Sequence, residues 1–282
     1  MNPKTTGALR VPARAKLTLS LRVIGVRRDG YHELDAEMVE LDLADELVIE
    51  PEGDGVTFEF DGPSGVLAAG PENLVVRALA AVGRRAGVHV MKRIPVGGGL
   101  GGGSADAAAV LRWAGCRDLD VALSLGADVP FCLVGGRARI GGIGERVEPL
   151  APEARSFVLL LPPLAVETAA VYRAWDSLDE QRRRSGAGGN DLEAAALAVE
   201  PALARWRDVL AEATGTAPRL AGSGSTWFVE GAPEDLGLGG VERLEIDGGL
   251  GTLRAVRTAA PPDGGTEKDP ATSPPGAASA SP

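Results

Sequence analysis

The chain has 282 residues, of which 44% are hydrophobic and 24% are charged. This composition supports a sizeable buried core and excludes both an intrinsically disordered chain and a small disulfide scaffold. With 39 acidic against 29 basic residues, the net charge of -10 argues against a nucleic acid or an acidic membrane as partner. A small anionic ligand is still allowed.

Cysteine usage and the N-terminal region indicate the compartment. Cys116 and Cys132 are too few for a disulfide framework and lack the spacing of a zinc site. Basic residues interrupt the apolar positions of residues 1–25, as they would not in a signal peptide. The longest apolar run, residues 157–166, contains two prolines and is shorter than the roughly 20 residues of a membrane-spanning helix. We therefore expect a cytoplasmic protein without a membrane segment.

The first part of the chain favours antiparallel strands. Leucines alternate with polar residues from Ala15 onward, which predicts a half-buried strand with Lys16 on the face opposite the leucines. After a turn at residues 28–30, further strands are expected at residues 37–43, 46–51 and 56–60. Helical spacing follows over residues 73–86, and a short strand over residues 88–93 leads into a run of glycines.

Composition changes near residues 149–152, where we place a domain boundary between residues 1–150 and residues 151–260. A buried strand at residues 157–161 opens the second domain. Helices follow at residues 168–184 and 191–213, the second interrupted or kinked at Pro201, and strands at residues 225–230 and 253–257. Residues 261–282 have almost no apolar side chains and are predicted to be a disordered tail.

The strongest local signal is the segment PVGGGLGGGSA at residues 95–105, in which six of the seven residues from 97 to 103 are glycine. Glycine permits positive φ and lets a ligand approach backbone N–H groups closely. Ser104 is expected to cap the helix that follows, with Asp106 in its first turn. A glycine loop at a helix N-terminus is an anion site, most often for phosphate.

Three other interpretations of this loop are weaker. A dinucleotide-binding loop requires an acidic residue at the end of a second strand, whereas Asp118 and Asp120 lie in a short irregular link. A Walker A loop requires a lysine before its hydroxyl residue, but glycine precedes Ser104. A flexible hinge would leave the ordered helix start unexplained. The remaining interpretation is a nucleotide-phosphate loop that takes its cation from elsewhere in the chain.

The segment PVGGGLGGGSADAA resembles the phosphate loop of the GHMP kinases, in which Pro-x-x-x-Gly-Leu-Gly is followed by small residues. Four further segments in the same order are similar to those of the family member that acts on a CDP-linked methylerythritol: residues 12–17 (PARAKL), 28–34 (RDGYHEL), 125–131 (LGADVPF) and 220–225 (LAGSGS). The resemblance covers residues 11–258.

This resemblance implies ATP-dependent phosphorylation of a hydroxyl on the methylerythritol part of that substrate, in the non-mevalonate route to isoprenoid precursors. It also implies an α+β fold of two domains, the first ribosomal-S5-like and the second ferredoxin-like, with the active site in the cleft between them.

Phosphoryl transfer requires neutralised charge and a group that receives the hydroxyl proton. The resemblance places Lys16 and Asp128 side by side, with Asp128 as general base or hydroxyl-orienting group and Lys16 as the cation that fixes its ionised form. From the residues alone, Asp128 could merely cap a helix or turn, and Lys16 could be a solvent-exposed lysine. Because 25 of the 29 basic residues are arginine, a strand lysine suggests a specific need for an ammonium group.

The phosphates of ATP, the co-substrate, are expected on the backbone N–H groups of the glycine loop, with Mg²⁺ held mainly by phosphate and water. Ser104 could touch the metal or only cap the helix, and we assign no protein metal ligand. The resemblance places Asn73 and Lys92 in the adenosine pocket, although Asn73 could equally be a helix N-cap. The predicted ATP-binding residues are Asn73, Lys92, Pro95, Val96, Gly97, Gly98, Gly99, Leu100, Gly101, Gly102, Gly103, Ser104 and Ala105.

Aromatic residues are predicted to bind the cytosine of the substrate. A tyrosine can stack on the base and a histidine can hydrogen-bond its Watson–Crick edge. With the resemblance, the base would lie between Tyr31 and Tyr172, beside His32. Without it, Tyr31 could pack on the core, His32 could be solvated, and Tyr172 could be a core residue of its helix. The predicted substrate-binding residues are Thr18, Tyr31, His32, Thr168, Tyr172, Gly222 and Ser223.

The chain departs from the family pattern in two places. Thr18 stands where the family usually has asparagine, and residues 113–124 form a shorter segment than expected. Residues 221–225 are a second glycine loop, which in the family closes over the phosphate side of the cleft and otherwise would be a plain hairpin turn. Two alternatives stay open: a GHMP kinase acting on homoserine or a sugar, which needs no stacking aromatics, and a nucleotide-binding protein without catalysis, which needs neither Lys16 nor Asp128. The sequence gives no oligomeric state.

Overall fold

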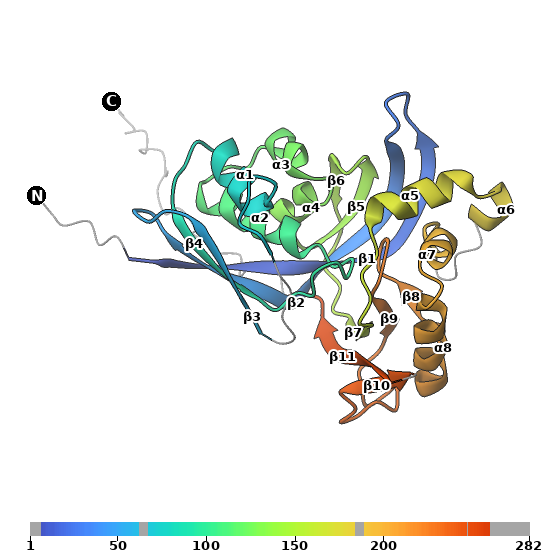
Figure 1. Ribbon diagram of the computed structural model, residues 1–282. Helices are drawn as coiled ribbons and strands as arrows, with labels where there is room; N and C mark the ends of the chain where they lie inside the picture. Colours follow the sequence, from blue (N-terminus) through green and yellow to red (C-terminus); the bar gives the residue numbers. More distant parts are fainter. Residues whose placement is uncertain (1–6, 62–66, 184–188, 247, 260–282) are drawn as a thin grey trace, which may run out of the picture.

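The computed structural model describes residues 7–61, 67–183, 189–246 and 248–259. The predicted tail at residues 261–282 lies outside the described residues. Within them, strands form two sheets against which the helices pack (Figure 1), and the predicted α+β class is confirmed. No helix in these ranges is both long and apolar enough to cross a membrane.

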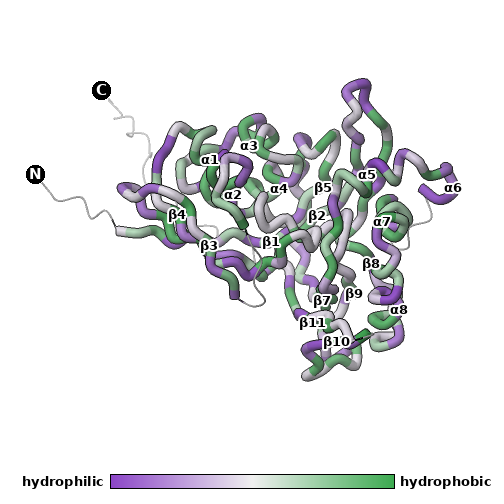
Figure 2. The backbone as a smooth tube through the Cα atoms, viewed as in Figure 1, coloured by the Kyte–Doolittle hydropathy of each residue, from purple (hydrophilic) through white to green (hydrophobic). Residues whose placement is uncertain are grey.

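Two long strands, β1 (Leu9–Val26) and β2 (His32–Glu50), dominate the first sheet. They pair antiparallel along their length and join at a hydrophilic hairpin tip (Figure 2). The other strands of this sheet, in the order β3-β4-β2-β5-β6, are β3 (Val56–Phe60), β4 (Gly87–Lys92), β5 (Arg137–Gly142) and β6 (Arg146–Pro149). The sequence patterns did not predict β5 or β6.

The prediction that β1 is half-buried is wrong for residues 15–19, which are all buried. The glycine loop covers Lys16, because a Cβ placed on Gly101 would lie 2.8 Å from the Lys16 Cγ. Register shifts between Arg14 and Lys16 and between Thr18 and Ser20 interrupt the pairing with β2 on either side of Lys16 and Thr18. Such bulges re-aim side chains and are common beside active sites.

Four helices lie together on one side of the first sheet (Figure 1): α1 (Leu74–Ala81), α2 (Gly102–Trp113), α3 (Leu119–Leu125) and α4 (Val129–Val134). Alanines let α2 enter the core, and its residues 105–111 are all buried. The helix predicted over residues 73–86 ends earlier than expected. Gly83 follows α1 with a φ of 61°, a left-handed conformation that stops a helix.

The second sheet has the strand order β10-β11-β7-β9-β8. Its strands are β7 (Ser156–Leu161), β8 (Arg219–Leu220), β9 (Trp227–Glu230), β10 (Arg243–Ile246) and β11 (Gly249–Arg257). The buried strand predicted at residues 157–161 is confirmed as β7. Neither β8 nor β10 was predicted.

Each of the two helices predicted for the second part is divided in the structure. The first becomes α5 (Thr168–Ser177) and α6 (Glu180–Arg183). The second becomes α7 (Glu193–Val199) and α8 (Leu203–Thr214), because proline at position 201 cannot continue the first of them.

Contacts with β1 and β2 tie the second part of the chain to the first. Asn190 forms a bridge with Leu21, and Thr258 forms one with Leu41. The Asn190 amide also donates to the carbonyl oxygens of Leu220, at 2.9 Å, and Gly222, at 2.7 Å. The domain boundary at residues 150–151 stays a prediction, and the change from one sheet to the other falls between β6 and β7.

Candidate active site

A cavity of about 530 Å³ lies where the two parts of the chain meet. Its lining includes residues 95–104 of the glycine loop, Lys16 and Thr18 of β1, and Asp128 before α4. Ala105, also predicted to bind ATP, is buried in α2 and is not among the lining residues. The second part contributes residues that include Thr168, Tyr172, Gly222 and Ser223. A cavity of this size accommodates a small-molecule ligand.

The glycine loop is held between β1 and the second glycine loop. Gly97, Gly99 and Gly101 all have positive φ, between 69° and 76°. A Cβ on Gly99 would overlap the carbonyl oxygen of Ala221 and lie 2.8 Å from that of Gly224. Other residue types are therefore excluded at Gly99 both by backbone conformation and by space.

The start of α2 differs from the prediction. The N-cap is Gly101, so Ser104 is the third residue of the helix and the prediction that it caps α2 is wrong. The expectation that Asp106 lies in the first turn is also wrong, since that turn holds no acidic residue. Left-handed Gly101 turns the chain into the helix at the end of the loop, which leaves the first backbone N–H groups of α2 beside the cavity.

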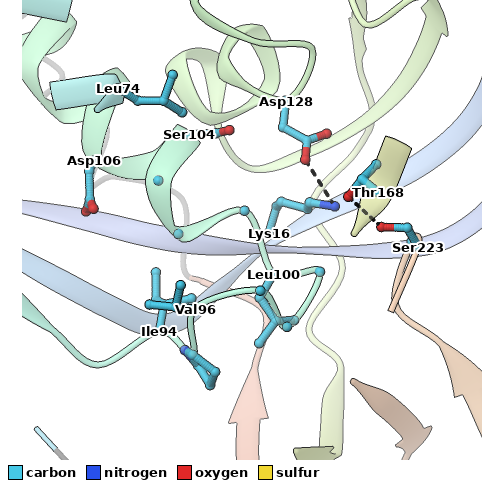
Figure 3. Close-up of a pocket in the computed structure, with 18 of the residues that line it drawn as sticks. Lys16, Leu74, Ile94, Val96, Leu100, Ser104, Asp106, Asp128, Thr168 and Ser223 are labelled. Carbon is cyan, nitrogen blue, oxygen red and sulfur yellow. Dashed lines mark hydrogen bonds and ion pairs between the residues drawn. The ribbon is translucent and has the colours of Figure 1, made fainter. Parts of the chain in front are cut away.

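Lys16 and Asp128 face each other in the cavity (Figure 3). The distance from Lys16 Nζ to Asp128 Oδ2 is 3.3 Å, and the two side chains are 6% and 34% exposed. The Lys16 ammonium also donates to Thr18 Oγ1 at 3.1 Å. Asp128 occupies the N-cap position of α4 without a side-chain capping hydrogen bond, so its carboxylate is available to the cavity.

The second glycine loop stands next to this pair. Thr168 Oγ1 and Ser223 Oγ are 2.9 Å apart, within hydrogen-bond distance (Figure 3). A Cβ on Gly222 would lie 3.5 Å from the Lys16 ammonium nitrogen, which shows how closely this loop approaches the pair. The structure thus gathers five predicted residues around the Lys16 ammonium group: Thr18, Asp128, Thr168, Gly222 and Ser223.

The two residues predicted for the adenosine pocket both line the cavity, but their polar groups are engaged within the protein. Asn73 is the N-cap of α1, where its Oδ1 accepts from Val75 N at 2.9 Å, as the alternative interpretation stated. Lys92 is 3% exposed, and its ammonium donates to Asp45 and, at 2.7 Å, to Asp106.

Asp45, which lies beside Lys92, was not predicted from the sequence. Its Oδ1 accepts from the backbone N–H groups of Arg93, at 2.5 Å, and Ile94, at 2.8 Å. A signal was present, because Asp45 falls in the same alternation as the buried residues Leu41, Leu43, Leu47 and Ile49. A carboxylate in an apolar row requires a buried partner.

The pKa values of Asp106 and Lys92 are both shifted in this cluster. Burial raises the pKa of Asp106 to about 7, with the charge of Lys92 opposing the shift and that of Asp45 adding to it. Burial pushes the pKa of Lys92 down, but the two carboxylates outweigh that effect and the pKa is raised above its ordinary value.

The aromatic residues predicted for cytosine are only partly brought together. The His32 and Tyr172 ring centroids are 4.7 Å apart, and His32 Nε2 is 2.8 Å from an Asp176 carboxylate oxygen. Tyr172 lines the cavity and burial raises its pKa. Tyr31 is 60% exposed near the hairpin tip, and neither Tyr31 nor His32 is among the residues that line the cavity.

A glycine loop at a helix N-terminus beside a lysine–aspartate pair is an arrangement suited to phosphoryl transfer. The comparisons with known proteins place the chain among the small-molecule kinases of the GHMP class. The GHMP kinases N terminal domain matches residues 73–136. The mevalonate kinase of Methanococcus jannaschii, 12% identical, shares the fold with a TM-score of 0.58 over 92% of this chain and 100% of its own.

More similar relatives show which family within this class the chain belongs to. The 4-diphosphocytidyl-2-C-methyl-D-erythritol kinase of Ruegeria pomeroyi is 40% identical over 246 residues, which cover 78% of this chain and 88% of that protein. The crystal structure of a 4-(cytidine 5'-diphospho)-2C-methyl-D-erythritol kinase is 34% identical, with a TM-score of 0.65 over 89% of this chain and 100% of its own. The chain belongs to the 4-diphosphocytidyl-2-C-methyl-D-erythritol kinase family.

Proposed function

We propose that the protein transfers the γ-phosphoryl group of ATP to a hydroxyl of 4-diphosphocytidyl-2-C-methyl-D-erythritol, giving the 2-phosphate and ADP. This reaction belongs to the non-mevalonate route to isoprenoid precursors, and we place it in the cytoplasm. The observation that carries the proposal is the ion pair between Lys16 and Asp128 beside the phosphate loop. The names of the relatives support the choice of substrate.

In this mechanism the substrate hydroxyl lies against Asp128, whose carboxylate is one-third exposed and can be reached from the cavity. As the hydroxyl oxygen bonds to the γ-phosphorus, its proton passes to Asp128 and the bond to the bridging oxygen of ADP breaks. Lys16 is held by Thr18 and Asp128, and its ammonium neutralises charge on the phosphoryl oxygens.

The backbone N–H groups of residues 97–104 are proposed to hold the phosphates of ATP. Among the described residues, no group of three or more His, Cys, Asp or Glu side chains is placed to hold a metal ion. The cavity nevertheless offers the Ser104 hydroxyl, an oxygen ligand of the kind that Mg²⁺ accepts beside phosphates and water. When bound, Mg²⁺ would neutralise charge on the phosphates that mainly hold it.

The cytosine is proposed to stack on Tyr172, with His32 at its polar edge and Tyr31 covering it from the hairpin. Tyr172 lines the cavity and contacts His32, which supports its part in this arrangement. Asp176 fixes the orientation of the His32 ring through its bond to Nε2. Tyr31 must approach from its exposed position for the base to lie between two rings.

The substrate assignment is tested by measuring ADP release in the presence of ATP and Mg²⁺ with each of four candidate substrates: 4-diphosphocytidyl-2-C-methyl-D-erythritol, homoserine, galactose and mevalonate. Turnover with the cytidylyl substrate alone is expected. Turnover with homoserine or a sugar instead would overturn the substrate assignment. ATP binding without turnover on any of the four would favour a non-catalytic nucleotide-binding protein.

A further inference from the structure

Three buried charged residues from separate elements meet beneath the phosphate loop. Asp45 comes from β2, Lys92 ends β4 and Asp106 lies in α2. Their side chains are at most 3% exposed, and the Lys92 ammonium bonds to both carboxylates. Asp106 lies on the other side of the α2 start from the Lys16–Asp128 pair (Figure 3), so this cluster is distinct from that pair.

The cluster holds the chain at both ends of the phosphate loop. Before the loop, Asp45 Oδ1 accepts from the backbone N–H groups of Arg93 and Ile94, the two residues that precede Pro95. After the loop, Asp106 Oδ2 accepts from Lys92 at 2.7 Å. A Cβ placed on Gly102, the first residue of α2, would lie 3.2 Å from the Lys92 ammonium nitrogen.

Above the raised pKa of Asp106, about 7, the cluster contains more negative than positive charge. One ammonium faces two carboxylates, and Asp106 Oδ1 has no hydrogen-bond partner among the described residues. An incompletely satisfied buried ionic group is a poor source of stability, because desolvation offsets much of the attraction. Its place between the two ends of the loop therefore points to a role in shaping the loop.

We propose that Asp45 and Asp106 are positioning residues for ATP. Both accept hydrogen bonds from the Lys92 ammonium and thereby fix the separation of the two ends of the phosphate loop. Lys92 then acts on ATP through the loop, since its ammonium donates to two carboxylates of the protein. This inference rests on the proposed function of the loop as the ATP phosphate site.

The hydrogen bonds of the two carboxylates differ, and the difference gives a matched pair of variants. Both oxygens of Asp45 accept hydrogen bonds. In Asp45→Asn the amide N–H₂ group replaces one of these acceptors, so a donor faces either the Lys92 ammonium or the two backbone N–H groups. Only Oδ2 of Asp106 accepts a hydrogen bond. The amide oxygen of Asp106→Asn can keep that bond with Lys92, while its N–H₂ group takes the place of Oδ1 and faces no other donor.

The test compares wild type, Asp45→Asn, Asp106→Ala and Asp106→Asn by the KM for ATP, the KM for the CDP-linked substrate, and the thermal unfolding midpoint. We expect Asp45→Asn to raise the KM for ATP about tenfold or more, while the other KM changes less than about twofold. Asp106→Ala should raise the KM for ATP several-fold, and Asp106→Asn should restore it. Because Asp106→Ala leaves a neutral Lys92–Asp45 pair, it keeps the proposal testable if Asp45→Asn does not fold.

Equal increases in both KM values, or a lower unfolding midpoint with normal KM values, would show that the cluster is only structural. Failure of Asp106→Asn to rescue the alanine variant would also overturn the proposal. The Kd of a non-hydrolysable ATP analogue, measured by calorimetry on the same four proteins, distinguishes failure of this positioning proposal from failure of the proposed kinase function. If wild type binds the analogue but does not phosphorylate the CDP-linked substrate, the proposed function fails while the Kd values still test the cluster.

Discussion

At the scale of single residues, the site depends on how each polar group is paired. The Lys16 ammonium bonds to Thr18 and pairs with Asp128, whereas the Lys92 ammonium is enclosed by two carboxylates. Asp128 is the more exposed partner of its pair, as a group that meets a substrate must be. The two lysines therefore have different parts, one facing the reactants and the other holding the loop.

Asp106 makes stability depend on pH. In the unfolded chain its carboxyl ionises near the ordinary pKa of 3.8, whereas in the folded protein burial raises the pKa to about 7. Between these values the folded protein holds a proton that the unfolded chain has released, so the free energy of unfolding falls as the pH rises. Urea unfolding at about pH 5 and about pH 8 should show a loss on the order of one to a few kcal/mol in wild type, and a smaller loss in Asp106→Asn. Equal losses of stability in wild type and Asp106→Asn would show that Asp106 is not the group responsible for the pH dependence.

Tyr172 is predicted to matter for the cytidylyl substrate and not for ATP. Replacing it by leucine keeps an apolar side chain packed against the core but removes the aromatic face. The KM for the CDP-linked substrate should rise about tenfold, as expected for loss of base stacking, with an unchanged KM for ATP. An unchanged KM for the CDP-linked substrate would restrict Tyr172 to the core of α5.

At the scale of elements, the two glycine loops form one unit. Thr226 N donates to Gly98 O at 3.3 Å, and Gly99 is packed against the carbonyl oxygens of Ala221 and Gly224. The loop that follows β8 therefore sets the position of the loop that precedes α2. Each loop would shift if the other changed shape.

Gly99→Ala tests this contact between the loops. Its new methyl group would overlap the Ala221 carbonyl oxygen, so we expect loss of ATP binding, measured by calorimetry. Gly115→Ala is the matched control, since Gly115 has the same φ of 76° but nothing within 4 Å of a new Cβ. That control should lose about 1 kcal/mol of stability and keep its affinity for ATP. Similar affinities in the two variants would show that the loops do not constrain each other.

Several elements could be predicted from the sequence because their periodicity is local. The alternation in β1 and the apolar run of β7 are examples, whereas the glycine-containing strand β5 and the two-residue β8 carry little periodic signal. Ser104 was predicted as the cap of α2 because serine is a strong capping residue, but left-handed Gly101 takes that position. The cluster around Lys92 joins residues distant in sequence, so only the misplaced charge of Asp45 could have indicated it.

At the scale of the whole molecule, the cavity exists because the second part of the chain docks on β1. Asn190 connects the two, since its amide donates to Leu220 O and Gly222 O while its backbone bridges to Leu21. The position of Gly222 beside Lys16 depends on this attachment. The pairing of Lys16 with Asp128 occurs within the first part, but the cavity is completed by the second.

Asn190→Ala should therefore affect stability and both substrates. It removes three buried hydrogen bonds, the two that the amide donates to Leu220 O and Gly222 O and the one that its Oδ1 accepts from Leu192 N, which should lower the free energy of unfolding by about 2–4 kcal/mol. Both KM values should also rise, because the second glycine loop loses its support. Chemical denaturation and steady-state kinetics measure these effects. Loss of stability with normal kinetics would show that the docking does not shape the cavity.

The central claim is that Asp128 receives the substrate proton beside Lys16, and the most direct measurement is ADP release by wild type and Asp128→Asn on the CDP-linked substrate. Asp120→Asn, an exposed position in α3, controls for the substitution itself. We predict a kcat lower by about 10²–10⁴-fold in Asp128→Asn, with an unchanged KM for ATP and normal turnover in the control. A kcat for Asp128→Asn within a few-fold of wild type would contradict the account.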